Sequence, residues 1–86
     1  MFVILSYDIN KKRVSKVMKT CRKYLVHVQE SVFEGVITEG KLARLKTELK
    51  NIVNVEEDSV CIYQMESIKF AYKEEIGTVK VHSHII

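Results

Sequence analysis

Apolar and polar positions at the start of the chain follow first a strand pattern and then a helix pattern. Residues 2–8, FVILSYD, form a short aliphatic run with a polar end, which is typical of a central β-strand. From Lys11 to Tyr24, apolar residues recur at intervals of three and four, which predicts a helix with one buried face. Either Asp8 or Asn10 is expected to provide the side-chain oxygen that caps this helix.

The middle of the chain repeats the two patterns. Residues 26–38 are rich in β-branched side chains with a break near residues 30–31, which predicts one bent strand or two short paired strands. A second helix is expected to begin at residues 38–40 and to end near Val53. Its buried face is the apolar stripe of Leu42, Leu45, Leu49, Ile52 and Val53.

The last part of the chain begins with an acidic turn at residues 54–58, NVEED. Residues 59–65 then alternate as a strand, with their aliphatic side chains on one face. Residues 69–73 are expected to form a short strand or helix, and residues 78–82 alternate like an edge strand. The chain is therefore expected to end with an extra C-terminal strand.

The order of the predicted elements, β-α-β-β-α-β, is that of an α+β, ferredoxin-like sandwich, in which both helices cover one face of an antiparallel sheet. All 86 residues are expected to form one domain, because the chain has no proline and no Ser/Gly-rich boundary. A chain of this length buries only roughly 60–65% of its unfolded surface. Since the second sheet face stays open, we expect a homodimer, with residues 66–86 in its contacts.

Composition narrows the class of protein. An apolar fraction of 47% and a charged fraction of 29% are typical of a soluble globular domain. No apolar run approaches the roughly 20 residues that cross a bilayer, and the N-terminus lacks the pattern of a signal peptide. We therefore expect a cytoplasmic protein without a membrane partner, in which Cys21 and Cys61 remain reduced thiols.

Positive charge is concentrated in one quarter of the chain. Between Ile9 and Gln29 there is no acidic residue, and the segment holds half of the 14 Lys and Arg residues: Lys11, Lys12, Arg13, Lys16, Lys19, Arg22 and Lys23. A field of one sign attracts a polyanion, so this helix is expected to bind the phosphates of a nucleic acid. The alternative is a solvated helix face, although such faces usually mix both signs.

Asp8 is the strongest candidate for a catalytic or metal-binding residue, because it stands at the end of a strand, where functional side chains often lie. The alternative is a cap for the helix that follows. Magnesium is often held by one or two carboxylates together with water and phosphate oxygens. In a twofold dimer, Asp8 could meet its own copy across the axis, and the two carboxylates would place one cation beside a phosphodiester.

Other residues allow more than one interpretation. Tyr7 could stack or hydrogen-bond near Asp8, or it could pack in the core. A lone histidine in a strand, such as His27, is more often packed or solvated than catalytic. Ser31 and Phe33 look structural from the pattern alone. The sequence has no Gly-rich phosphate loop, no nucleophile elbow and no zinc motif.

Four segments carry a resemblance to a known family: VILSYDIN, KRVSKVMKTCRKYL, HVQESVFEG and DSVCIY. In order and spacing they closely resemble the small CRISPR-associated protein that is the second core member of the adaptation pair and partners the spacer-integrating enzyme. The resemblance covers residues 1–65, and the string VQ-x-SVFEG is distinctive.

The resemblance implies a function and a set of partners. Members of this family are described as metal-dependent endonucleases on single-stranded RNA or double-stranded DNA, usually with Mg²⁺. They form ferredoxin-like homodimers in the prokaryotic cytoplasm, bridge two copies of the CRISPR integrase dimer and hold the incoming DNA. Their C-terminal strand, here near residues 78–82, crosses to pair with the partner's sheet.

The resemblance also implies roles for individual residues near Asp8. Asp8 falls on the family's metal ligand, so one Mg²⁺ per dimer would be shared by Asp8 of both chains. Tyr7 falls on the adjoining family tyrosine and is expected to be catalytic. His27 stands where some members carry arginine, and a mostly neutral histidine would bind or cleave RNA less well. This departure weakens the expectation of nuclease activity more than that of a scaffold.

The nucleic-acid contacts implied by the resemblance come from two segments. Arg13 matches an arginine at the start of the helix, and Lys12 and Lys16 stand beside it in the basic segment. Ser31 and Phe33 fall in the SVF string, which lies near the active site in family members. We expect all five side chains to contact RNA or DNA.

Three functions compete at this point. The first is an endonuclease that uses Mg²⁺ and Asp8. The second is a non-catalytic dimeric adaptor that only binds DNA and bridges integrase dimers. The third, which sets the resemblance aside, is a ferredoxin-like module that binds a small molecule, and it leaves the basic segment without a use.

Overall fold

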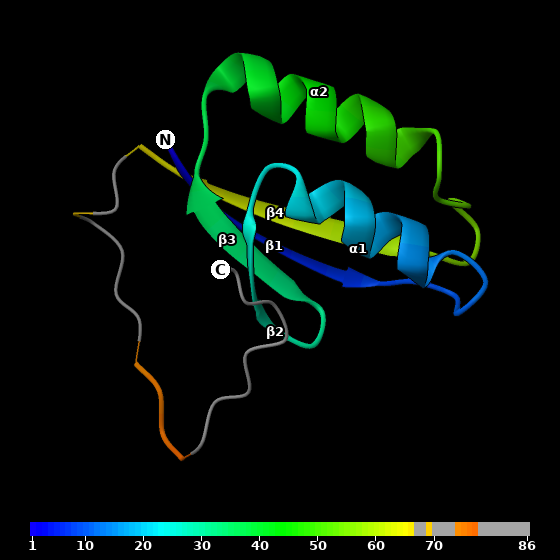
Figure 1. Ribbon diagram of the computed structural model, residues 1–86, viewed down its shortest axis with the longest axis horizontal. Helices are drawn as coiled ribbons and strands as arrows, with labels where there is room; N and C mark the ends of the chain where they lie inside the picture. Colours follow the sequence, from blue (N-terminus) through cyan, green and yellow to red (C-terminus); the bar gives the residue numbers. More distant parts are fainter. Residues whose placement is uncertain (67–68, 70–73, 78–86) are drawn as a thin grey trace.

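The computed structural model describes residues 1–66, 69 and 74–77, and its elements follow one another as the pattern predicts. In chain order they are β1 (Phe2–Asp8), α1 (Val14–Arg22), β2 (Val26–Gln29), β3 (Val32–Val36), α2 (Glu39–Lys50) and β4 (Ser59–Met65). The strands form one sheet in the order β2-β3-β1-β4, and each neighbouring pair is antiparallel (Figure 1). The predicted α+β, ferredoxin-like fold is therefore confirmed.

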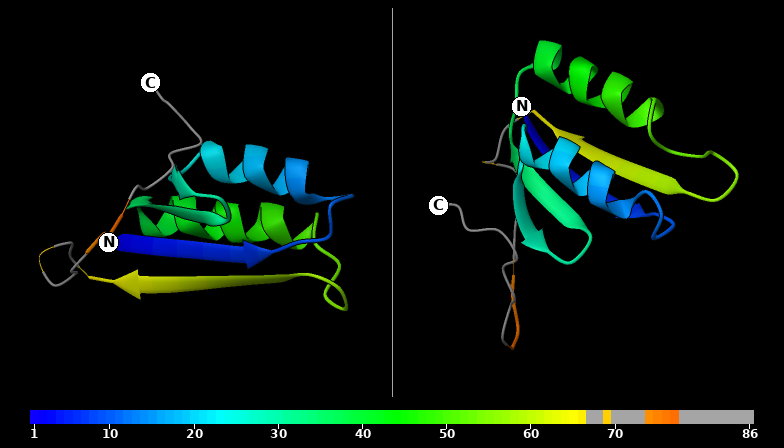
Figure 2. Two further views of the ribbon diagram at one scale, coloured as in Figure 1. Left: turned by 90° about the horizontal axis from the view of Figure 1, so that it is seen from below. Right: turned by 45° about the vertical axis from the view of Figure 1, so that its right-hand side comes forward.

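Both helices lie on the same face of the sheet, and the core fills the space between the two layers (Figure 2). Side chains alternate along β1, so Val3, Leu5 and Tyr7 are buried while Ile4 and Ser6 are only partly covered. The helices complete the core with residues from one face of each: Val17 and Cys21 from α1, and Leu42, Leu45 and Leu49 from α2. The apolar stripes are thus confirmed within the helices, but the predicted end near Val53 is wrong, because α2 ends at Lys50 and leaves Ile52 and Val53 beyond the helix.

The helix α1 begins later than its apolar pattern predicts. Residues 11–13 form a turn, in which the side-chain oxygen of Asn10 accepts a hydrogen bond from the Lys12 amide at 2.9 Å. The Asn10 carbonyl oxygen accepts from the amides of Arg13 and Val14 at 2.8 and 3.1 Å. The helix itself has no side-chain cap. Neither Asp8 nor Asn10 therefore caps the helix as predicted, and Asn10 instead closes the turn that precedes it.

The break predicted near residues 30–31 is a turn between two short paired strands, β2 and β3. A register shift between His27 and Gln29 bends β2 at this point. The helix α2 is capped by Thr38, whose hydroxyl oxygen accepts from the Lys41 amide at 3.2 Å. In the described part of the chain, no helix is both long enough and apolar enough to span a membrane.

The sheet face that turns away from the helices, here called the open face, carries large exposed apolar side chains. It contains Ile4 and Ser6 of β1, and the strand register adds Val26, Val36 and Tyr63. These last three side chains are 52%, 71% and 57% exposed, respectively. Exposed apolar surface of this kind often marks a protein–protein contact. The open face is therefore a suitable surface for the homodimer, which stays a prediction.

The strand or helix predicted for residues 69–73 and the edge strand predicted for residues 78–82 cannot be compared with the structure. Residues 70–73 and 78–82 lie outside the described residues.

Candidate functional site

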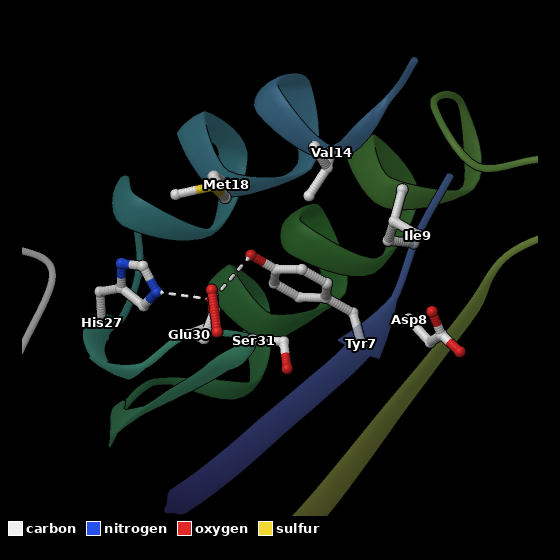
Figure 3. A pocket seen from close by; sticks show the side chains of 8 residues that line it. All are labelled: Tyr7, Asp8, Ile9, Val14, Met18, His27, Glu30 and Ser31. Carbon is white, nitrogen blue, oxygen red and sulfur yellow. Dashed lines mark hydrogen bonds between the residues drawn. The ribbon is translucent and has the colours of Figure 1, made fainter. Parts of the chain in front are cut away.

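Asp8 is the last residue of β1, and its side chain is exposed. It lies opposite Ser59 of β4, and by strand alternation it belongs to the open face together with Ile4 and Ser6. In Figure 3 its carboxylate points toward β4 and away from the Tyr7 ring. Among the described residues, the carboxylate has no hydrogen bond and no ion pair. It is therefore free to bind an external cation or hydrogen-bond donor.

A hollow of about 470 Å³ lies beside the end of β1 (Figure 3). The residues that line it come from the end of β1, from α1 and from the β2–β3 region: Tyr7, Asp8, Ile9, Val14, Met18, His27, Glu30 and Ser31. Apolar walls with a few polar groups are typical of a ligand site. Tyr7 and Ser31 are thus two predicted site residues that the fold brings to the same place as Asp8.

One backbone carbonyl holds two polar side chains of this hollow. The Glu30 carbonyl oxygen accepts a hydrogen bond from the Tyr7 hydroxyl at 3.5 Å and one from Nε2 of His27 at 3.1 Å (Figure 3). Burial raises the pKa of Tyr7 above its usual value, so the phenol stays protonated near neutral pH. The Tyr7 hydroxyl therefore acts as a donor to the β2–β3 turn and is directed away from Asp8.

Phe33 and His27 pack against each other in the interior. Phe33 is 0% exposed and His27 is 1% exposed. Their rings stack with centroids 4.3 Å apart, and the Tyr7 ring lies 6.2 Å from Phe33. The ring is enclosed and supports its two aromatic neighbours, which agrees with the structural role that the pattern alone indicated, and its contact with nucleic acid stays a prediction. His27 is packed in the interior, which agrees with the expectation that a lone histidine in a strand is packed or solvated.

Arg13 is bound to the acidic turn at residues 54–58. Its Nε donates to Oδ2 of Asp58 at 2.6 Å, and its Nη2 donates to Oε1 of Glu57 at 2.7 Å. The hydrogen bonds from Arg13 hold the pKa of the Asp58 carboxyl well below its usual range. Arg13 is thus engaged within the chain, and its contact with nucleic acid stays a prediction.

The other basic side chains of residues 9–29 are exposed, and one of them is also paired. Lys23 forms an ion pair with Glu48 of α2. The remaining five basic side chains form no ion pair in the part of the chain that the structure describes. We call them the basic surface: Lys11, Lys12, Lys16, Lys19 and Arg22. Lys12 and Lys16 thus keep the exposure that their predicted contact with phosphates requires.

A metal ion would find few ligands in a single chain. Across residues 1–66, 69 and 74–77, no group of three or more His, Cys, Asp or Glu side chains could hold a metal ion. The free carboxylate of Asp8 is one ligand, and Mg²⁺ accepts such a site when water and phosphate oxygens complete its shell. A second carboxylate would have to come from another copy of the chain.

Comparison with known families matches residues 1–72 to the family described as CRISPR associated protein Cas2. The CRISPR-associated endoribonuclease Cas2 of Dictyoglomus turgidum is 48% identical over 80 residues, which cover 93% of this chain and 92% of that protein. The protein of the same name from Thermotoga maritima is 46% identical over 80 residues, with the same two coverages.

Solved structures share the fold. A crystal structure described as that of cas2 has a TM-score of 0.86 and 40% identity, and the match covers 100% of this chain and 97% of that chain. The structure of Streptococcus pyogenes Cas2 at pH 6.5 has a TM-score of 0.77 and 31% identity, covering 90% of this chain and 100% of the other.

Proposed function

This chain belongs to the CRISPR-associated Cas2 family, and from this premise we propose that it is a metal-dependent endonuclease on RNA or DNA that takes part in the capture of new spacers. The free, exposed carboxylate of Asp8 at the end of β1 carries this proposal. Relatives such as those from D. turgidum and T. maritima are named endoribonucleases, so single-stranded RNA is the first substrate to test.

A homodimer would complete the metal site. Because Asp8 shares the open face with Ile4 and Ser6, two copies packed through this face would bring their Asp8 carboxylates toward each other. Two carboxylates with water and phosphate oxygens suffice for one Mg²⁺ per dimer. When bound, the ion would neutralise charge on the scissile phosphate and lower the pKa of a bound water.

The basic surface would supply the remaining contacts with substrate. Lys12 and Lys16 are exposed close in sequence to Asp8, and phosphate neutralisation by such side chains provides most of the affinity for a nucleic acid. Ser31 lines the hollow beside Asp8, where its hydroxyl group can bind an oxygen of the substrate. These residues would hold the backbone while Asp8 holds the cation.

A second candidate is a non-catalytic dimeric adaptor that binds DNA and bridges dimers of a CRISPR integrase. The burial of Phe33 and the internal pairing of Arg13 favour it, since both residues are withdrawn from a substrate. Both candidates use the same basic surface, the same open face and the prokaryotic cytoplasm. They differ in whether the Asp8 carboxylates support hydrolysis.

A cleavage assay separates the two candidates. The purified protein is incubated with labelled single-stranded RNA or duplex DNA, with Mg²⁺ or with EDTA. The variant Asp8→Asn removes the ligand, and Glu56→Gln removes the same charge from an exposed position of the acidic turn as a control. We expect cleavage that needs Mg²⁺ and falls by more than about 100-fold in Asp8→Asn, with Glu56→Gln unchanged.

Two other results would change the conclusion. Equal cleavage by Asp8→Asn and the wild-type protein would mean that the activity does not come from this site. DNA binding at low salt without any cleavage would leave the adaptor as the function.

A further inference from the structure

On the basis of the function proposed above, we propose that Asp58 is a positioning residue that fixes the geometry of Asp8 through the β1–α1 loop, residues 9–13. The two carboxylates come from distant parts of the chain and have different surroundings. The Asp8 carboxylate is exposed and free, whereas the Asp58 side chain is fully buried. Asp58 would therefore act on the reaction without touching the substrate.

The Asp58 carboxylate accepts four hydrogen bonds from three residues, two of which belong to the β1–α1 loop. Its Oδ1 accepts from the backbone amide of Asn10 at 2.8 Å and from Nη2 of Arg13 at 3.2 Å. Its Oδ2 accepts from Nε of Arg13 at 2.6 Å and from the backbone amide of Asn54 at 2.9 Å. The carboxylate thus ties the β1–α1 loop to the acidic turn before β4.

Both ends of this connection lie next to Asp8. Asn10 follows Asp8 by two residues, at the point where β1 has ended and its backbone leaves the sheet ladder. Ser59 follows Asp58 directly and is paired with Asp8 across the β1–β4 ladder. Asp58 therefore restrains the chain just after Asp8 and the strand residue opposite it.

Directional bonds of this kind define a geometry more than they add stability. A buried ion pair is a weak source of net stability, because the cost of removing its charges from water offsets most of the attraction. Charge-assisted bonds with a bidentate arginine are short and strongly directional, so they permit one loop arrangement. Mg²⁺ demands near-ideal octahedral geometry, and a small displacement of its ligand would be felt in the rate.

The test compares Asp58→Asn with Glu48→Gln. The second variant removes the partner of Lys23 and Tyr24 at the other end of α1, and it serves as a control for losing an ion pair between α1 and a distant segment. For Asp58→Asn we expect kcat on single-stranded RNA to fall by about tenfold or more while KM changes by less than about twofold. The Mg²⁺ concentration for half-maximal rate should rise. Glu48→Gln should keep kcat, KM and Mg²⁺ dependence.

A second measurement does not depend on nuclease activity. Amide hydrogen exchange followed by NMR should show faster exchange at Asn10 and Arg13 in Asp58→Asn than in the wild-type protein or Glu48→Gln. If the wild-type protein does not cleave, the proposed function fails, and this exchange pattern still decides whether Asp58 orders the loop. Unchanged exchange together with a wild-type kcat in Asp58→Asn would overturn the positioning role.

Asp58→Asn could unfold the chain, so a milder variant accompanies it. Arg13→Lys keeps the positive charge but loses the planar fork that binds both oxygens of Asp58. We expect a smaller loss of kcat in Arg13→Lys, again without a matching change in KM. A loss of stability in Arg13→Lys with unchanged kcat and unchanged loop exchange would reduce Asp58 to a structural residue.

Discussion

Tyr7 and Asp8 are neighbours in the chain but belong to opposite faces of the sheet. The Tyr7 ring lies on the helix side, 6.2 Å from Phe33, and its hydroxyl is directed to the Glu30 carbonyl. The Asp8 carboxylate lies on the open face at the end of β1. The two side chains therefore have separate tasks, and Asp8 is the one with access to a cation.

The variant Tyr7→Phe tests this separation. It keeps the ring and removes a hydroxyl whose bond to Glu30 is long, so we expect cleavage to fall by less than about threefold and stability by at most about 1 kcal/mol. Tyr24→Phe, which removes a hydroxyl bonded to Glu48 outside the hollow, is the control. Single-turnover cleavage and urea unfolding measure the two effects. A loss of about 100-fold in Tyr7→Phe would instead make the phenol a catalytic group.

Asp58 gives the fold a dependence on acid. The bonds from Arg13 lower its pKa in the folded protein, so its contribution to stability is complete above the unfolded pKa of about 3.9 and is lost as the pH falls through the lower folded value. We expect the Tm of the wild-type protein to drop below about pH 4 more steeply than that of Asp58→Asn, which lacks the titrating group. Thermal unfolding from neutral pH to about pH 2.5 measures both curves. Parallel curves would contradict this assignment.

At the scale of elements, the strands and helix faces were readable from the sequence. The first and last strands in chain order, β1 and β4, have the predicted bounds, because each is a short run of strand-forming residues between polar segments. The helix stripes also agree, since burial selects one face of a helix. The start of α1 was missed because the turn closed by Asn10 competes with helical bonds, and an apolar periodicity does not report on such a turn.

The site was less readable, because its contacts join distant segments. Arg13 and Asp58 are 45 residues apart, and a basic residue at a helix start looks the same whether or not an acid reaches it from elsewhere. The sequence did contain one indication of this ion pair: residues 9–29 hold no acidic residue, while residues 56–58 are all acidic. The burial of Phe33 agrees with the structural role that the strand pattern indicated, whereas the role implied by the resemblance concerns contacts that one chain does not contain.

The basic surface predicts how binding of nucleic acid depends on salt concentration. The double variant Lys12→Gln/Lys16→Gln should bind RNA or DNA more weakly, and its slope of log K against log salt should decrease by up to about 2, because each phosphate contact contributes about 0.7–0.9. The control Lys41→Gln/Lys50→Gln removes two exposed charges from α2. Binding isotherms at several salt concentrations give the slopes. Equal slopes in the two double variants would show that the basic surface is not where nucleic acid binds.

At the scale of the whole molecule, the open face is the apolar surface that a single chain leaves exposed to solvent. Val26, Val36 and Tyr63 lie exposed on it, and Asp8 stands at its end. A second copy on this face would cover apolar area that a short chain needs to bury, and it would also pair the carboxylates. The same contact would thus serve both stability and the metal site.

The two cysteines report on this contact. Cys61 is exposed and lies on the open face opposite Ser6, whereas burial raises the pKa of the Cys21 thiol to about 12. We expect a thiol reagent near neutral pH to label Cys61 quickly in dilute protein and slowly at concentrations that favour the dimer. Cys21 should react only after denaturation and serves as the internal reference. A labelling rate of Cys61 that is independent of concentration would argue against a dimer through this face.

Mixed dimers test most directly whether two Asp8 carboxylates carry the reaction together. Wild-type and Asp8→Asn chains are mixed in known proportions, allowed to exchange subunits, and assayed for Mg²⁺-dependent cleavage of labelled single-stranded RNA. If both carboxylates are needed, activity follows the square of the wild-type fraction, because only dimers of two wild-type chains retain the pair. A linear dependence would show that each Asp8 acts independently of its copy, and a curve above that line would show that one Asp8 per dimer suffices. Activity that does not depend on the wild-type fraction would contradict any role for Asp8.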